Sequence, residues 1–252
     1  TLTNCYMIKL IILETLHLIR KILTILKKHC LPDPPQLWDN AIPLSLSTYE
    51  MYVKEQMEKC FNTFKPYFQS SVLLEYKKYQ KYIIDKAKEN DIENKKFYLE
   101  FGVFTGRTIN YFSKHVNKIY GFDSFEGLKE DWVGQSYPKG AFNLNKKLPK
   151  LNKNVVPIIG LVQDTLVSFL EKHKPEINFV HLDMDTYETT KFVLTKIKPY
   201  LSKNTIIAFD QLYNFPGWEV GEYKALKETF NENEYKFISF CTNGGQSAIQ
   251  II

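Results

Sequence analysis

Cysteine is scarce in this sequence, with four residues in 252, and the four are far apart. None belongs to a Cys-x-x-Cys pair, and none has a histidine at metal-ligand spacing. This pattern argues against a zinc site and against a disulfide framework. We therefore expect a protein of a reducing compartment, with a cytoplasmic location.

A large excess of charge of one sign is also missing. The 33 basic and 28 acidic side chains leave a formal net charge of +5, and no dense cluster of lysine and arginine alternates with aromatic residues. The most basic stretch, 146–154, lies among asparagine, leucine and proline, which indicates a solvated loop. The sequence therefore indicates no nucleic-acid partner.

The third absence is a long uncharged hydrophobic run. Residues 6–28 are the most apolar segment, but charged residues interrupt them well short of the ~20 residues that a membrane span needs. Their leucines and isoleucines recur at helical spacing, which predicts an amphipathic helix. We expect this helix to pack on the rest of the chain or on a second subunit, and hence a homo-oligomer. Association with a membrane surface without spanning it and cleavage as a targeting segment are the open alternatives.

The sequence divides into three predicted parts. We expect an N-terminal amphipathic helix at 1–30, a linker and helical cap at 31–95, and a main domain at 96–252. Four prolines in 31–43 prevent a continuous helix there. Two apolar stripes at helical spacing follow, and we expect both to face a core. The first consists of Tyr49, Tyr52, Val53, Met57, Cys60 and Phe61, and the second of Val72, Leu73, Tyr76, Tyr79, Ile83 and Ile84.

From residue 97 onward, short apolar runs alternate with longer amphipathic ones. Strands are predicted at 97–101, 118–123, 155–159, 178–182 and 205–209, followed by an antiparallel pair at 235–241 and 247–252. Helices are predicted near 106–115, 164–173, 187–200 and 219–230. This alternation is typical of an α/β fold with a mostly parallel, Rossmann-like sheet and helices on both faces. Ligands of such folds bind beyond the carboxyl ends of the strands.

The first predicted strand ends in a glycine turn that lacks the G-x-G-x-x-G pattern of dinucleotide enzymes. Gly102 and Gly106 are spaced G-x-x-x-G, and Glu100 lies two positions before the first glycine. A carboxylate there would repel a pyrophosphate, but it suits a cationic ligand such as the amino group of S-adenosylmethionine. An ordinary glycine turn without a ligand is the alternative.

Two further strand ends carry polar residues at cofactor spacing. Asp123, with Ser124 beside it, follows the glycine turn by about 20 residues, where an acidic side chain can accept hydrogen bonds from both hydroxyls of a ribose. Gln163 and Asp164 follow the third strand, a position that commonly frames an adenine ring. Asp164 can equally be the N-cap of the next helix.

The fourth and fifth strand ends are rich in acids. Asp183 and Asp185 follow the fourth strand, and Asp210 and Gln211 follow the fifth. Because neighbouring parallel strands end at the same edge of a sheet, we expect Asp183 and Asp210 to converge. Clustered oxygen ligands suit Mg²⁺, which takes one or two carboxylates and keeps several waters. An N-cap aspartate beside a structural aspartate is the alternative.

These motifs together resemble the macrocin O-methyltransferase family of class I methyltransferases and, more distantly, catechol O-methyltransferase. The resemblance rests on seven stretches in order, namely LEFGVFTGRTIN (99–110), YGFDSFEGLKEDW (120–132), YPKGAF (137–142), GLVQDTL (160–166), VHLDMDTYETTKFVL (180–194), IIAFDQLYNFPGWEVGEYKAL (206–226) and GGQSAIQI (244–251). It implies a seven-strand sheet, S-adenosylmethionine as methyl donor and, often, a divalent metal. One departure is the Asp-Gln pair at 210–211, where relatives carry Asp-Asp, Asp-Glu or Asp-Asn.

The resemblance implies a role for each of these residues. The residues assigned to the cofactor are Glu100, Gly102, Gly106, Asp123, Ser124, Gln163, Asp164 and Asp183. Those assigned to Mg²⁺ are Asp183, Asp210 and Gln211. Asp183 and Asp185 are the predicted catalytic residues, with Asp185, His181 and Glu219 as candidates for the base.

The predicted reaction is methyl transfer to a hydroxyl of a sugar or another polar small molecule. Six aromatic residues are expected to line the acceptor pocket, namely Trp132, Tyr137, Phe142, Tyr213, Phe215 and Trp218. A nicotinamide-dependent oxidoreductase and a non-catalytic scaffold are the alternative functions.

Overall fold

The computed structural model describes Thr15, Leu18, Ile19, Lys21 and residues 47–252. Residues 48–252 form one compact unit. The predicted helix at 6–28 and the proline-rich linker fall almost entirely outside the described residues, so the three-part division of the chain stays a prediction. Among the described helices, none is long and apolar enough to cross a bilayer.

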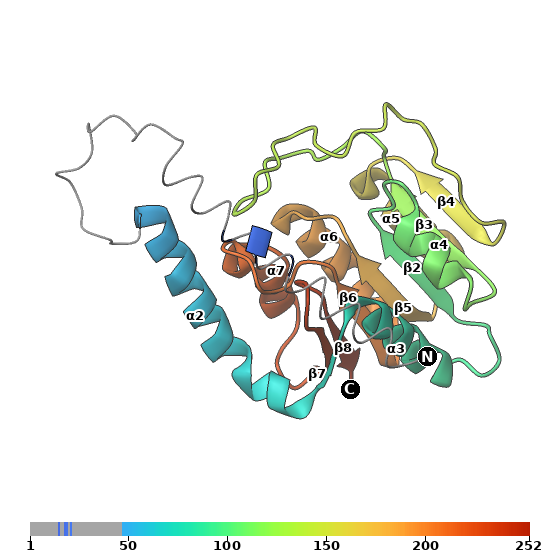
Figure 1. The fold of residues 1–252 in the computed structure, drawn as a ribbon. Helices are drawn as coiled ribbons and strands as arrows, with labels where there is room; N and C mark the ends of the chain where they lie inside the picture. The colour runs from blue at the N-terminus through green and yellow to red at the C-terminus, as the bar shows by residue number, and fades with distance from the viewer. Residues whose placement is uncertain (1–14, 16–17, 20, 22–46) are drawn as a thin grey trace. The chain divides into compact units, whose positions relative to one another are not determined.

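The described unit is built on a single eight-stranded sheet, with the strand order β1-β7-β8-β6-β5-β2-β3-β4 (Figure 1). Among these strands only β8 runs antiparallel to its neighbours, so the sheet is mostly parallel, as predicted. The strands are β1 (Val72–Leu74), β2 (Phe97–Phe101), β3 (Ile119–Asp123), β4 (Val155–Ile159), β5 (Ile177–Leu182), β6 (Leu201–Phe209), β7 (Tyr235–Cys241) and β8 (Ser247–Ile251).

Seven of these strands agree with the sequence prediction, and the eighth corrects it. The sequence pattern places Val72 and Leu73 in a helical stripe, but they form β1, which pairs in parallel with β7. The helix after them begins only at Tyr76, because Glu75 has extended backbone angles. Apolar periodicity cannot separate a short edge strand from the helix that follows it directly, so the sequence pattern predicts β1 and α3 as one helix.

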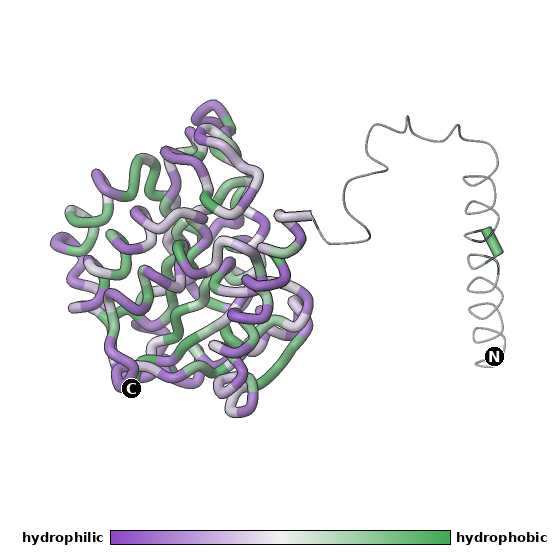
Figure 2. The backbone as a smooth tube through the Cα atoms, turned by 90° about the vertical axis from the view of Figure 1, so that its left-hand side faces the viewer, coloured by the Kyte–Doolittle hydropathy of each residue, from purple (hydrophilic) through white to green (hydrophobic). Residues whose placement is uncertain are grey.

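Helices cover both faces of the sheet. One core cluster joins the sheet to residues of α2 (Thr48–Ser70), α5 (Val162–His173), α6 (Tyr187–Ile197) and α7 (Glu222–Thr229). The opposite cluster joins it to α3 (Tyr76–Glu89) and α4 (Arg107–Ser113). Two short 3₁₀ helices, η1 (Lys198–Tyr200) and η2 (Trp218–Val220), precede β6 and α7. In Figure 2 the hydrophobic stretches of backbone run mainly through the interior of this unit.

Helix α2 attaches through only part of the predicted stripe. Cys60 is buried and Val53 and Met57 are half-buried, as predicted, but Tyr49, Tyr52 and Phe61 are exposed, and the buried Phe64 was not in the stripe. The Phe64 ring lies within 6.3 Å of seven aromatic rings, which come from α2 itself, the β6–α7 connection, α7 and β7. Trp218 also donates an indole hydrogen bond to the Gln56 carbonyl at 3.3 Å. The carboxyl-terminal half of α2 is therefore part of the same core as the sheet.

A long connection between β3 and β4, residues 124–154, contains no helix or strand and passes over the carboxyl end of the sheet (Figure 1). Backbone hydrogen bonds hold it to itself, for example from Leu128 to Ala141 at 2.9 Å and from Trp132 to Tyr137 at 3.0 Å. Gly134 packs so closely on Gly217 that a Cβ on Gly134 would lie 2.3 Å from the Gly217 Cα. The connection is thus a fixed wall above the strand ends.

Candidate active site

A cavity of about 600 Å³ opens at the carboxyl edge of the parallel strands. Its lining comes from the glycine turn after β2, the ends of β3, β4, β5 and β6, and the 124–154 connection. Eight of the predicted cofactor, metal and catalytic residues line this cavity, namely Gly102, Asp123, Ser124, Gln163, Asp183, Asp185, Asp210 and Gln211. Glu100, Gly106 and Asp164 are not part of the lining.

Both glycines of the turn have a left-handed backbone, with φ of +86° at Gly102 and +79° at Gly106. A Cβ on Gly102 would lie 1.8 Å from the Asp183 carbonyl oxygen, and a Cβ on Gly106 would lie 2.8 Å from the Leu151 side chain. Gly102 is therefore required by the close approach of the chain after β5. Gly106 is required where α4 begins, away from the cavity.

Asp123 anchors the glycine turn through its carboxylate. One oxygen accepts hydrogen bonds from the backbone N–H groups of Val103 and Phe104, both at 2.8 Å. The other oxygen accepts one from the Phe125 N–H at 2.7 Å. A carboxylate offers about four acceptor positions. Roughly one position is therefore left for a ligand, rather than the two that a pair of ribose hydroxyls was predicted to use.

Glu100 lies beneath the cavity and is fully buried. One carboxylate oxygen accepts a hydrogen bond from the Thr108 hydroxyl at 2.8 Å, and the other lies 3.3 Å from Nδ1 of His181. Burial by itself disfavours the imidazolium, but the interaction with Glu100 outweighs it, and the pKa of His181 is raised. Glu100 therefore faces His181 and the start of α4, and a direct contact with a ligand would need it to turn.

Gln163 and Asp164 lie in the first turn of α5, and both are exposed. Gln163 lines the cavity, whereas Asp164 does not. The N-cap of α5 is Leu161, and the backbone N–H of Asp164 is bonded to the Leu161 carbonyl at 3.0 Å. The alternative interpretation of Asp164 as an N-cap is therefore wrong, because the N-cap lies three residues earlier.

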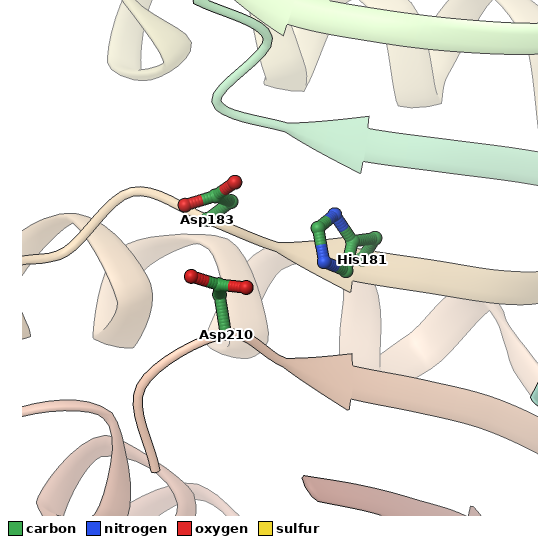
Figure 3. A group of neighbouring side chains, drawn as sticks. All are labelled: His181, Asp183 and Asp210. Atoms are coloured by element: carbon green, nitrogen blue, oxygen red, sulfur yellow. The ribbon is translucent and has the colours of Figure 1, made fainter. Parts of the chain in front are cut away.

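Asp183 and Asp210 converge from the ends of β5 and β6, as the parallel arrangement predicts (Figure 3). Together with His181 they offer three ligand atoms that all lie within 4.8 Å of one another. Figure 3 shows the two carboxylates facing each other, with His181 further back along β5. Burial and the nearby Asp210 carboxylate raise the pKa of Asp183 well above its usual value. Two facing carboxylates of this kind favour either a shared proton or a cation.

Asp185 lies at the same edge and also lines the cavity. It is 8% exposed, and its backbone is left-handed with φ of +68°. For a residue other than glycine, such a conformation is uncommon and is concentrated at functional sites. Burial, with a smaller contribution from Asp210, raises the pKa of Asp185 from 3.8 to about 7.

Asp210 is held by two side-chain amides. The Gln211 amide nitrogen donates to one carboxylate oxygen, and the Gln246 amide nitrogen donates to the other at 3.1 Å. Behind this pair, the fully buried Glu222 accepts a hydrogen bond from the Gln211 backbone N–H at 3.0 Å. Burial raises the pKa of Glu222 well above its usual value. Sequence reasoning assigned no role to Gln246 or Glu222, although Gln246 lies in the matching stretch 244–251.

The donor set at this edge fits a hard divalent cation. Asp183 and Asp210 supply carboxylate oxygens, which Mg²⁺ prefers. The amide oxygen of Gln211 is buried and has no hydrogen-bond partner among the described residues. An unpaired buried acceptor of this kind is costly unless a ligand satisfies it. The oxygen chemistry therefore suits the ion that the sequence resemblance implies.

The two remaining candidates for the base lie off the cavity. His181 is buried behind Asp183 and packs edge-on against Phe112. Glu219 is in η2 and forms an ion pair with Lys59 of α2 at 2.8 Å. Neither lines the cavity, so Asp183 and Asp185 are the predicted catalytic residues that do.

Aromatic side chains of the 124–154 connection form another part of the cavity lining, which we call the aromatic wall. Trp132 stacks on Tyr137 with ring centres 5.6 Å apart, and Phe142 packs on Tyr137 at 4.9 Å, all three within the cavity lining. The other predicted wall residues, Tyr213, Phe215 and Trp218, are buried and do not line the cavity, so that part of the prediction is wrong. The rings of Tyr213 and Trp218 pack on Phe64 of α2, whereas the Phe215 ring packs edge-on against Trp132.

Comparison with known proteins agrees with this geometry. Residues 99–212 match a family model described as a methyltransferase domain. The crystal structure of CalS11, a calicheamicin methyltransferase, is similar with a TM-score of 0.55 and 22% identity, over 91% of this chain and 90% of that one. The structure of the O-methyltransferase NovP gives a TM-score of 0.50 and 19% identity, over 69% and 79%. No curated protein matches the chain in sequence.

These matches concern the same segment that carries the glycine turn, Asp123 and the acid cluster. The family model spans the chain from β2 to the residues just after β6, which is the part that builds the cavity. The match to a methyltransferase domain favours methyl transfer over the alternative function of a nicotinamide-dependent oxidoreductase. Residues 99–212 therefore match a methyltransferase domain in sequence, and the chain shares the fold of the methyltransferases CalS11 and NovP.

Proposed function

We propose that this protein transfers the methyl group of S-adenosylmethionine to a hydroxyl oxygen of a polar small molecule, with a sugar as the favoured acceptor. The observation that carries the proposal is the cavity at the carboxyl edge, because one and the same cavity is lined by the glycine turn and Asp123 and by Asp183, Asp185 and Asp210. A donor and an acceptor bound in it would meet beside the acids.

The donor would occupy the side nearest the glycine turn. Asp123 would accept a hydrogen bond from a ribose hydroxyl, the Ser124 hydroxyl would bond to the ribose as well, and Gln163 would lie beside the adenine. Glu100 and Gly106 would act indirectly, Glu100 through Thr108 and His181 and Gly106 through the start of α4. Bound S-adenosylmethionine supplies a methyl group on a sulfonium, which is already activated for transfer.

The protein's part in the reaction is alignment and proton removal. The acceptor oxygen forms a bond to the methyl carbon as the carbon–sulfur bond breaks, and the acceptor's proton must leave. Asp185 is the favoured base, because its carboxylate borders the cavity and its pKa of about 7 is close to the pH at which it would work. Asp183 is the second candidate.

Asp183, Asp210 and the amide oxygen of Gln211 would hold a divalent cation. Such an ion supplies a Lewis acid for the acceptor oxygen and lowers the pKa of its hydroxyl. The charge of the two carboxylates would then be balanced without a shared proton. Gln211 contributes one charge less than a carboxylate at this position would, so we expect weaker binding than in a site with three acids.

The acceptor side is the aromatic wall. Trp132, Tyr137 and Phe142 present ring faces and edges, which pack well against the apolar faces of a sugar. NovP, which shares the fold, is described as an O-methyltransferase, and this supports oxygen as the methyl-accepting atom.

Calorimetry and an acceptor screen would test the proposal. S-adenosylhomocysteine should bind in the range of ~1 μM to 1 mM that is common for metabolites. Hydroxylated sugars should gain one methyl group, and EDTA should abolish the transfer. Asp183→Asn and Asp210→Asn should each reduce turnover strongly while S-adenosylhomocysteine affinity stays the same. Glu171→Gln is the control, because Glu171 is exposed on α5 and is not part of the cavity lining.

Three outcomes would change the proposal. Failure to bind S-adenosylhomocysteine would favour a non-catalytic scaffold. Full activity in EDTA would remove the cation and leave Asp183 or Asp185 as the base of a metal-free enzyme. Methylation of an amine or a carbon atom in the screen would refute O-methylation while leaving the donor assignment intact.

A further inference from the structure

We propose that Gln246 is a positioning residue that fixes the Asp210 carboxylate for its role at the acid cluster. The inference rests on the proposed function, because it concerns how one of the proposed cation ligands is oriented. Gln246 lies just before β8, 36 residues from Asp210 in sequence, and donates its amide hydrogen bond to Asp210 at 3.1 Å.

Both oxygens of the Asp210 carboxylate accept hydrogen bonds from neutral side-chain amides. Gln211 binds one oxygen and Gln246 binds the other. A single donor would leave the carboxylate free to rotate about its last torsion, whereas donors on both oxygens fix the plane of the group. Because amides carry no charge, this arrangement orients the carboxylate without supplying a counter-ion, and its negative charge remains available to a ligand in the cavity.

The two glycines before Gln246 explain how its side chain reaches Asp210. A Cβ on Gly244 would lie 2.1 Å from the amide oxygen of Gln246, so only glycine leaves room for the amide in this position. A Cβ on Gly245 would lie 2.7 Å from the Tyr213 carbonyl oxygen. The Gly245 carbonyl in turn accepts a hydrogen bond from the Leu212 N–H at 3.0 Å. The Gly-Gly-Gln stretch therefore docks directly on the segment that follows β6.

The backbone of Gln246 is fixed as well. Its carbonyl accepts a hydrogen bond from the Cys241 N–H at 2.8 Å, which closes the turn between β7 and β8. The turn thus joins the antiparallel end of the sheet to the end of β6. Gln246 transmits that rigidity to Asp210, as residues around a metal ligand commonly do.

Two variants test this role by different means. Gln246→Ala removes the donor. Gly244→Ala leaves the donor present but displaces it, because the new methyl group would collide with the far end of the flexible Gln246 side chain. Gln250→Ala, on β8, is the matched control. Mn²⁺ binding to the S-adenosylhomocysteine complex, followed by electron paramagnetic resonance, is the readout.

We expect Mn²⁺ affinity to fall about 10- to 100-fold in both Gln246→Ala and Gly244→Ala. The control should bind Mn²⁺ normally, and S-adenosylhomocysteine affinity should be equal in all four proteins. Loss of both affinities together would indicate a general disruption of the fold and overturn the positioning role. Wild-type Mn²⁺ affinity in both variants would also overturn it.

A crystal structure of Gly244→Ala separates this inference from the proposed function. If the wild-type protein binds no Mn²⁺, the proposed cation site fails, but the orientation of Asp210 can still be compared directly. A turned or two-fold disordered Asp210 carboxylate in the variant would support the positioning role. An Asp210 carboxylate that is unmoved after Gln246 has been displaced would refute it.

Discussion

Replacing Asp123 with alanine should both destabilise the protein and weaken the binding of its cofactor product. The Asp123 carboxylate accepts hydrogen bonds from three backbone N–H groups. Two of these belong to buried residues, Val103 and Phe125, which are 4% and 2% exposed. A hydrogen bond to a charged group contributes roughly 1.5–3 kcal/mol. The two buried bonds together therefore contribute about 3–6 kcal/mol, while water can replace the bond to the exposed Phe104.

For a domain of this size, each kcal/mol corresponds to about 2–4 °C of Tm. The Asp123→Ala variant should therefore melt at least ~6 °C below the wild type in a calorimetric scan. Loss of one charge-assisted hydrogen bond to the ribose should also weaken S-adenosylhomocysteine about 10- to 150-fold, measured by calorimetry at a temperature where the variant is folded. Glu126→Ala is the control, because it removes a neighbouring carboxylate that contacts only exposed lysines.

The two measurements separate two roles of one side chain. A lowered Tm with unchanged S-adenosylhomocysteine affinity would refute the ribose contact and leave Asp123 as the anchor of the glycine turn. An unchanged Tm would refute the anchoring role, because the three backbone donors would then have found other acceptors without a penalty.

Three further changes have clear expectations. Gly102→Ala should prevent folding or S-adenosylhomocysteine binding, because its methyl group would lie 1.8 Å from the Asp183 carbonyl oxygen. Its control is Gly140→Ala, because Gly140 has φ of +85° but no neighbour within 4 Å. This control should lose only ~1–2 kcal/mol of unfolding free energy in urea. Phe64→Ala should lose about 3–5 kcal/mol in the same assay. Deletion of 1–30 should change the mass of the particle in light scattering, and an unchanged mass would contradict the predicted subunit contact.

The strand ends of the parallel sheet can be predicted because the sequence signals that mark them, short apolar runs and turn residues, lie within the strands and next to them. The runs Phe97–Phe101 and Val155–Ile159 are short, apolar and bounded by turn residues, and both strands form with those bounds. The convergence of Asp183 and Asp210 followed from the rule that neighbouring parallel strands end at one edge. No comparable rule predicts the edge strand β1, because three residues beside a helix carry too little periodicity.

The tertiary partners of these residues were not predictable. Gln246 contacts Asp210 from 36 residues along the chain, and Glu222 contacts Gln211 from 11 residues along it, and neither contact has a local sequence signal. The burial of Tyr213 and Trp218 depends on α2, whose docking face includes Cys60 of the predicted stripe but is centred on Phe64, which lies outside it. Sequence patterns indicate which face of a helix is apolar, but α2 has apolar residues on several faces, and packing selects one.

The acid cluster makes the stability of the free protein depend on pH in a predictable direction. The pKa of Asp185 is about 7 in the folded chain against 3.8 as its usual value, so between these values the folded state holds a proton that the unfolded state has lost. The contribution of the Asp185 proton to the free energy of unfolding is complete below pH 3.8 and is lost as the pH rises through 7. The slope approaches ~1.4 kcal/mol per pH unit, so Asp185 alone removes about 2 kcal/mol between pH 5.5 and 7.5.

Other groups modify this trend without reversing it. Asp183 and Glu222 also have raised pKa values, as does His181, and all three act in the same direction as Asp185. Burial lowers the pKa of His115, which opposes the trend only below pH 6.5. The urea midpoint of the free protein should therefore fall from pH 5.5 to pH 7.5, and Mg²⁺ should raise it more at pH 7.5, where the acids are ionised. A midpoint that is constant or rises with pH would show that the acids are ionised in the folded chain without a cation, and the argument for a cation at Asp183 and Asp210 would lose its electrostatic basis.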